Sequence, residues 1–418
     1  MSTYAIIAFL LNLATALAYI NHRFIKMQPT IAIMAGSLLL SLTLIIMGSF
    51  GYGIQAYEKV SMLINSLDFH DLLMDGMLSF LLFAGALNVD LNDLNRVKWE
   101  ILSLAVFGTI ASCFLIATIT YGMLDWLGLH LTYNYCLLFG ALISPTDPIA
   151  VMATLKQIAA PRALNVKIAG ESLFNDGVAI VLFITIYRIT FGDGEAVTAT
   201  SILLLFSQQA IGGVLYGILL GLVTYKLMKP IDDHKTEILL TLTVTTGGYI
   251  FAQEIGVSGP LAMVMAGLFI GNRGKNFAMS PQSRKSLYEF WELIDEILNA
   301  VLFLLIGFEI LSLHDVSSSI LPGILAIPLV LLVRAVTVAL PMGLFKLKKS
   351  YPPYTTTIII WGGLRGGLAV ALALVIPGTE AERILILTMT YMVVLFSILV
   401  QGSTASYLIE RSKTASES

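Results

Sequence analysis

The residues of this sequence that could carry chemistry are acids placed inside long apolar stretches. Asp147 lies between Pro145 and Pro148 in the segment ALISPTDPIAV, and Glu171 and Asp176 lie in the next apolar segment, within GESLFNDGV. A charged side chain at the centre of a bilayer costs about 2.5–3.5 kcal/mol on insertion scales, so such residues usually pair with each other or mark an ion or proton path. The sequence therefore points to an ion or proton path through a membrane.

The prolines predict that the helix carrying Asp147 is interrupted. Pro148 removes a backbone donor and disfavours helical geometry at the residue before it. Backbone groups freed at membrane depth must be buried in protein or face a wet cavity, and broken helices in transporters use carbonyls and helix ends as ion ligands. A simple proline kink is the alternative, but a kink would not explain the adjacent acid.

The GESLFNDGV segment offers further oxygen atoms at helical spacing. Ser172 and Asp176 are four residues apart and share a helix face, and Glu171 and Asn175 share the neighbouring face. Oxygen ligands suit a hard cation such as sodium, by the same logic that applies to calcium and magnesium. The segment contains no histidine or cysteine, which argues against a transition metal.

Composition places these acids in a polytopic membrane protein. Of the 418 residues, 57% are hydrophobic and 12% are charged, whereas soluble domains carry about 25% charged residues. Cys113 and Cys136 both fall in apolar segments, so a disulfide framework is not expected. The net charge of -3 gives no indication of a nucleic-acid partner, and we expect none. The expected partners are membrane lipids and a transported monovalent cation.

Windows of roughly 20 apolar residues, the length that crosses a bilayer, predict about 13 transmembrane helices. Lysine and arginine gather in alternate connections, as expected for cytoplasmic loops. This asymmetry predicts an N-terminus outside, a C-terminus in the cytoplasm and a multi-pass protein of the plasma (inner) membrane. The connections are short, so we expect no separate soluble domain in residues 1–418. The predicted spans are 4–20, 31–48, 71–89, 99–121, 134–156, 164–188, 202–228, 237–254, 257–271, 289–311, 319–344, 355–376 and 383–408.

A second interrupted segment lies in the other half of the chain. WGGLRGGLAV places four glycines around Leu364 and Arg365 within the predicted span 355–376. Interrupted helices at corresponding positions of two inverted halves are the best sequence pointer to a binding site at the membrane midplane. We therefore predict two inverted repeats, spans 1–6 and 8–13, whose broken helices cross.

These segments resemble the signature sequences of the monovalent cation/proton antiporter family, in its branch of NhaP-type antiporters and animal sodium/proton exchangers. The resemblance rests on SPTDPIAV, GESLFNDGVAIVLF and GGLRGGLAVALAL, with VSGPLAMVMAGLFIGN and QGSTA in support. It implies an all-α antiporter fold with a dimerisation part (spans 1–3 and 8–10) and an ion-transport core (spans 4–6 and 11–13). The protein would be a homodimeric transporter, not an enzyme, and would need no cofactor.

The resemblance also assigns roles at the site. Asp147 and Asp176 would bind the sodium ion or the proton, and Ser172 and Thr146 would complete the sodium shell. Asn175 would hold the two broken regions together.

The remaining charges are expected beside this site. The resemblance implies a structural ion pair between Glu171 and Arg334, and Arg365 is a further candidate for a place near the acids. The family's additional acid in span 3 is not assigned to a residue, since Asp75 and Asp90 both lie near the ends of that span.

The charges inside the spans also predict the stoichiometry. Three acids and two arginines leave one negative charge, which either one sodium ion or one proton would neutralise. An empty charged site is costly to carry across lipid, so binding of either ion would permit movement. The resemblance likewise implies electroneutral exchange, because this branch carries Asn-Asp in place of Asp-Asp.

Other functions share parts of this pattern. A potassium/proton antiporter could use the same residues, which do not separate these cations. A channel would conduct without moving protons in exchange. An intramembrane aspartyl protease also uses two buried aspartates, but its usual Gly-x-Gly-Asp type of motif is missing. The leading hypothesis is a secondary antiporter that exchanges sodium, and also lithium, for protons by competition at Asp147 and Asp176.

Overall fold

A computed structural model describes residues 3–50, 60, 71–149, 151–152, 155, 162–192, 198–274, 279–312 and 317–417. Within these ranges the chain folds as helices and short connections, with no strand beyond one isolated bridge. The predicted all-α class is therefore confirmed. Three lysines that contributed to the predicted topology, Lys59, Lys156 and Lys275, lie outside the described residues.

The helices of the first half follow the predicted spans 1 to 6, and several contain a π-helical turn (η). Their bounds are α1 (Thr3–Ile20), η1 (Asn21–Ile25), α2 (Pro29–Ser49), η2 (Leu72–Met77), α5 (Leu78–Leu87), α6 (Leu91–Arg96), α7 (Lys98–Leu102), η3 (Ser103–Gly108), α8 (Thr109–Trp126), α9 (Tyr133–Ile143) and α11 (Arg162–Phe191).

The second half follows the predicted spans 7 to 13 in the same way, except that η6 is a 3₁₀ turn. Its elements are α12 (Ala199–Met228), α13 (His234–Thr243), η4 (Val244–Gly248), α14 (Tyr249–Glu254), α15 (Gly259–Phe269), η5 (Ile270–Gly274), α17 (Pro281–Phe308), η6 (Glu309–Ser312), α18 (Ile320–Lys346), α19 (Thr355–Trp361), α20 (Gly367–Leu374), α21 (Glu380–Phe396), η7 (Ser397–Gly402) and α22 (Ser403–Glu417).

Length and apolar composition allow seven of the described helices to cross a membrane. They are Ala5–Ile25, Pro29–Gly48, Lys98–Trp126, Arg162–Phe191, Thr200–Met228, Ile320–Lys346 and Ala381–Arg411. Leu72–Leu87 and Tyr133–Ile143 are apolar but shorter. The chain is therefore a multi-pass membrane protein, and the count of 13 crossings stays a prediction.

Local sequence explains where the long helices begin. Ser280 caps α17, since its side chain accepts a hydrogen bond from the backbone of Ser283, and Pro281 occupies the first turn. Thr379 and Glu382 form a reciprocal capping box at the start of α21. These caps satisfy backbone donors that would otherwise be left without partners.

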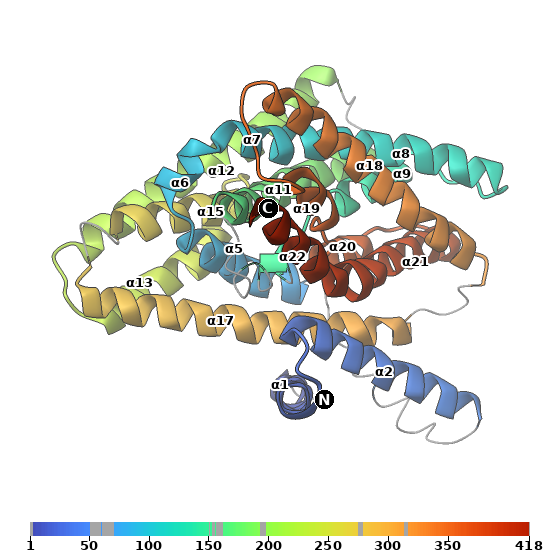
Figure 1. Cartoon of the computed structure of the whole chain (residues 1–418), viewed down its shortest axis with the longest axis horizontal. Coiled ribbons are helices and arrows are strands. Elements are labelled where there is room, and N and C mark those ends of the chain that lie inside the picture. Colours follow the sequence, from blue (N-terminus) through green and yellow to red (C-terminus); the bar gives the residue numbers. More distant parts are fainter. Residues whose placement is uncertain are drawn as a thin grey trace.

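The helices pack in two groups that alternate along the chain. In one group, α17 packs on α2, α5, α13 and α1, and α15 packs on α5. In the other group, α8, α9, α11, α18, α20 and α21 pack on one another. Figure 1 shows α17 across the lower part of the view, with α2 and α1 below it, and α18, α20 and α21 on the right. The groups meet where α11 contacts α5 and α15, and where α17 contacts α20.

Candidate cation and proton site

The helix that carries the first predicted break ends where the sequence places it. α9 ends at Ile143, and Ser144 to Pro148 form an irregular stretch before helical backbone resumes. Pro145 and Pro148 cannot donate backbone hydrogen bonds, which prevents the helical ladder from continuing here. Asp147 therefore sits in non-helical backbone, and its Oδ1 accepts a hydrogen bond from the backbone N–H of Ile149 at 2.9 Å.

The second predicted break lies directly against the first. α19 ends at Trp361 and α20 begins at Gly367, which leaves residues 362–366 irregular. The backbone N–H of Asp147 donates to the carbonyl of Leu364 at 2.8 Å, and the two residues form an isolated antiparallel bridge. Two segments more than 200 residues apart thus meet through their backbones, at the acid that the sequence singled out.

Arg365 ties the two breaks together more firmly than the bridge alone. Its Nη1 donates to the carbonyl oxygens of Ser144 at 2.8 Å and Pro145 at 2.6 Å, and the side chain is buried. The last carbonyls of a helix have no partner within it, and a cation near them is favoured by the helix dipole. Arg365 therefore belongs to the crossing, where it holds the end of α9 in place.

The α11 residues approach the same stretch from the other side. Ser172 Oγ donates to the Thr146 carbonyl at 2.5 Å. Asn175 Nδ2 donates to Thr146 Oγ1 at 2.8 Å, and the Thr146 N–H donates to Asn175 Oδ1 at 3.3 Å. These bonds join Asn175 to the first break through Thr146, while Asp147 and Arg365 make the hydrogen bonds between the two breaks. A bond from Asn175 to the second break stays a prediction.

The two aspartates are more exposed to solvent than the polar residues around them. Asp147 and Asp176 are partly exposed, whereas Thr146, Ser172 and Asn175 are buried. The carboxylates lie close enough for Asp147 to act electrostatically on Asp176. Carboxylate, hydroxyl and carbonyl oxygens thus converge in the arrangement that suits a hard cation.

A buried ion pair lies beside the site. Arg334 Nη1 lies 2.5 Å from Glu171 Oε1, and Arg334 Nη2 donates to the carbonyl of Ile359 at 3.0 Å. The two side chains are 7% and 3% exposed. The structure thus brings Glu171 and Arg334 into the contact that the resemblance implies, and it adds a bond from Arg334 to the helix before the second break.

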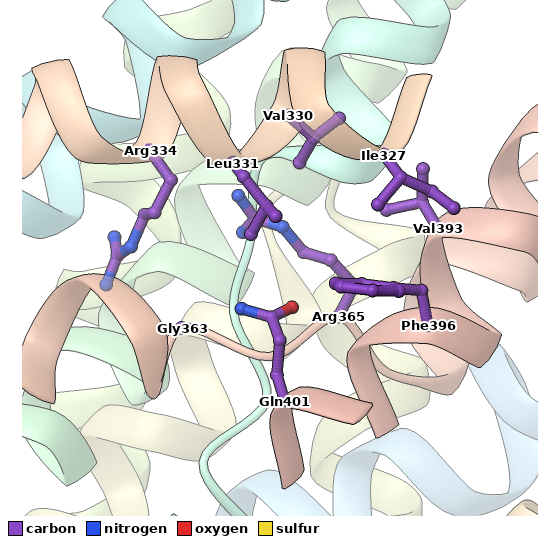
Figure 2. Close-up of a pocket in the computed structure, with 9 residues that line it drawn as sticks. All are labelled: Ile327, Val330, Leu331, Arg334, Gly363, Arg365, Val393, Phe396 and Gln401. Carbon is purple, nitrogen blue, oxygen red and sulfur yellow. The ribbon is translucent and has the colours of Figure 1, made fainter. Parts of the chain in front are cut away.

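A small pocket lies next to this ion pair, between α18 and the second break (Figure 2). Figure 2 shows the side chains of Arg334, Arg365 and Gln401 gathered around it. Gln401 Nε2 donates to the Trp361 carbonyl at 3.1 Å and Gln401 Oε1 accepts from Ser397 Oγ, while Ser397 Oγ accepts from the N–H of Arg365. No role was predicted for Gln401 or Ser397, although the QGSTA segment that contributed to the resemblance contains Gln401.

The acids at the ends of span 3 are engaged elsewhere. Asp75 accepts a hydrogen bond from Gln253 at 3.0 Å, and Asp90 caps α6. The described residues contain no group of three or more histidines, cysteines or acids that could hold a metal ion.

Gly366 is needed for the breaks to meet. A Cβ at this position would overlap the Asp147 side chain, whereas a Cβ on Gly343 of α18 would meet nothing within 4 Å. Overpacking of this kind costs about 1–3 kcal/mol. We expect Gly366→Ala to weaken sodium activation of transport by about tenfold and Gly343→Ala to leave it unchanged, as measured by sodium titration in vesicles. Equal behaviour of the two variants would contradict the contact.

Comparisons with known proteins agree with this geometry. Residues 10–411 match the sodium/hydrogen exchanger transmembrane family. The chain is 45% identical over 413 residues to the Na(+)/H(+) antiporter NhaP of Pseudomonas aeruginosa, covering 97% of this chain and 96% of that protein. It is 36% identical over 337 residues to the Na(+)/H(+) antiporter NhaH of Halobacillus dabanensis, covering 80% and 81%.

A solved structure has the same fold. The sodium proton antiporter MjNhaP1 from Methanocaldococcus jannaschii, determined at pH 8, superposes with a TM-score of 0.77 at 20% identity. The superposition covers 98% of this chain and 99% of that one. The predicted antiporter fold is thereby confirmed.

Proposed function

Because this chain belongs to the sodium/hydrogen exchanger family, we propose that it is a secondary antiporter that exchanges sodium for protons across the membrane. The observation that carries the proposal is the convergence of Asp147 and Asp176 where two helix breaks meet. Each acid can hold a proton, and the pair with its neighbouring oxygens can hold a hard cation. Sodium and protons then compete for the same charges, and the two acids titrate as a unit.

The hydrogen bonds around Thr146 support the ligand set that we propose. Ser172 Oγ uses its hydrogen on the Thr146 carbonyl, so the oxygen lone pairs of Ser172 remain available to a cation. Thr146 Oγ1 accepts from Asn175, which fixes its direction. We assign Asp147, Asp176, Ser172 and Thr146 to the sodium shell, with Asn175 as the residue that positions Thr146.

The packing of the helices supports a division into a fixed part and a moving part. We assign spans 1–3 and 8–10, which pack together around α17, to a dimerisation part, and spans 4–6 and 11–13 to the ion-transport core. Alternating access would arise when the core moves against the dimerisation part with either sodium or protons bound. A homodimer, with the N-terminus outside and the C-terminus in the cytoplasm, completes the proposal.

The position of Arg365 supports electroneutral exchange. Its guanidinium binds the carbonyls of Ser144 and Pro145, two residues or fewer before Thr146, so its charge counts toward the site. The five charges inside the predicted spans then sum to one net negative charge, which one sodium ion or one proton cancels. Reversal measurements in proteoliposomes test this point, because electroneutral exchange has an equilibrium that does not shift with membrane voltage. A voltage-dependent equilibrium would rule it out.

The direct test of function is proton movement in everted membrane vesicles on addition of sodium, lithium or potassium. We expect sodium and lithium to drive proton efflux from the vesicles and potassium to have little effect. A response to potassium alone would identify a potassium/proton antiporter on the same scaffold. A response to none of the three cations would contradict the proposal.

A further inference from the structure

A buried carboxyl group outside the transport site has no basic partner among the described ion pairs. Glu237, in the first turn of α13, has no exposed surface, and its side-chain oxygens make no hydrogen bond of ordinary geometry to the described residues, although the Ser283 hydroxyl lies near enough to act on it. It takes part in none of the ion pairs of the described chain. An isolated buried carboxylate is so costly that such a group normally neutralises itself. Glu237 therefore needs one positive charge.

The neighbours of Glu237 are acids and a serine. Asp232 and Asp233, in the connection before α13, are the charged groups that act on it, and Ser283 of α17 lies beside it. Ser283 is buried, and its hydroxyl donates to Asp232 Oδ1 at 3.5 Å. Further along α17, Trp291 continues the contact by donating to Thr241 of α13 at 3.0 Å. The charged groups that act on Glu237 are therefore acids, and the nearby His234 acts on Asp233, so among the described residues no basic side chain is recorded as acting on Glu237.

Asp233 does not compete for that charge. Its carboxylate caps α13 by accepting from the hydroxyl of Thr236 at 2.7 Å and from the backbone N–H of Thr236 at 3.1 Å. These bonds, the hydroxyl first, hold the pKa of Asp233 below its ordinary value. Asp233 thus stays ionised, and its negative charge favours a proton on Glu237.

A proton fits this place better than a metal ion does. Glu237 is completely enclosed, whereas a sodium ion would need room and several oxygen ligands. Asp232, in contrast, is exposed to solvent and is joined to the buried serine. Glu237, Ser283 and Asp232 thus form a line of oxygen atoms from the interior to the surface.

We propose that Glu237, Ser283 and Asp232 form a proton-binding site separate from the transport site, in which Glu237 holds the proton as a carboxylic acid. On release, Glu237 passes its proton to Ser283 Oγ, and Ser283 passes its own hydroxyl proton to Asp232. The negative charge is left on Glu237, and water takes the proton from Asp232. Ser283 ends with the same number of hydrogens as before.

Release of this proton would reach the transport site through α17. A bare charge on Glu237 between α13 and α17 would disfavour their packing. Leu302 and Ile306 of the same α17 lie against Gly367, the first residue after the second break, and would clash with a Cβ there. The site therefore couples the pH on the side where α13 and α17 begin, cytoplasmic in the predicted topology, to the helix that faces the moving core.

The test compares the purified full-length protein with Glu237→Gln, which has nearly the same shape as the protonated acid but cannot ionise. The matched control is Glu254→Gln, at an exposed position at the end of α14. Melting temperature is measured across a pH series. As pH rises, the wild type and Glu254→Gln should lose about 2–4 °C more than Glu237→Gln, because only they acquire the buried charge.

Two results would overturn the proposal. One is a Glu237→Gln protein whose melting temperature follows the wild type at every pH. The other is a Glu237→Gln protein whose melting temperature falls further below that of the wild type as pH rises, which would mean that the ionised carboxylate stabilises the fold. Melting does not depend on transport, so failure of this proposal and failure of the proposed exchange are separate results.

Discussion

Replacing Asp176 by asparagine is expected to abolish sodium-driven proton movement in everted vesicles, and replacing Asp147 by asparagine is expected to do the same. Asparagine preserves the shape of aspartate, and at position 147 it keeps an oxygen that can accept the hydrogen bond from the Ile149 N–H. It can neither carry a negative charge nor bind and release a proton. Proton movement should fall to the level of vesicles that lack the protein. The measurement is the response of a pH-sensitive dye to added sodium.

The matched control is Asp125→Asn, since Asp125 lies at the end of α8 with its side chain 70% exposed. This variant should transport like the wild type. The amount of each protein in the membrane must be measured alongside, so that loss of transport is not confused with loss of protein. Coupled exchange that persists in either site variant would show that the two acids are not the shared binding groups.

Breaking the ion pair beside the site is expected to reduce folded protein as well as transport. Arg334→Ala leaves Glu171 buried without its partner, and Glu171→Ala leaves Arg334 with only the Ile359 carbonyl. Removing one member of a buried pair costs about 3–5 kcal/mol. Both single variants should give less monodisperse protein in detergent and a lower melting temperature.

The double variant Glu171→Ala/Arg334→Ala separates charge from packing. It removes both charges, so it should recover part of the folded protein that either single change loses. The exposed pair of Lys285 and Glu289, 3.7 Å apart, provides the control, because alanine at either position should change little. Wild-type yield and transport in the single Arg334 variant would contradict a structural role for the pair.

Local sequence was sufficient to predict where the two helix breaks fall. Pro148 prevents a helix at Asp147, and the glycines around Arg365 allow α19 and α20 to separate. The cost of a charge in lipid was sufficient to single out Asp147, Asp176 and Arg334, because each is a charged residue inside an apolar segment. These inferences need only the chemistry of a residue and its immediate neighbours.

Contacts across the fold could not be predicted in this way. Arg365 binds the carbonyls of Ser144 and Pro145, more than 200 residues away, and carbonyls leave no signal in a sequence. Asn175 was expected to bridge both breaks, and the hydrogen bonds of its amide in the structure go to Thr146 of the first break. Which of several nearby partners an amide chooses depends on the three-dimensional packing.

The sequence likewise gave no indication that Glu237 is unusual. An acid in the first turn of a helix is ordinary, because the helix dipole favours it there. What is unusual is its complete burial, which arises because α17 covers it and places Ser283 beside it. Burial by a helix that begins more than 40 residues later is a property of the fold.

The central claim is that sodium and protons occupy the same two carboxyl groups in turn. The most direct measurement is proton release when sodium is added to the purified protein in weakly buffered solution. We expect about one proton to be released for each sodium ion bound, and no release from the Asp147→Asn/Asp176→Asn protein. Sodium binding without proton release, in the wild-type protein near its working pH, would contradict the account.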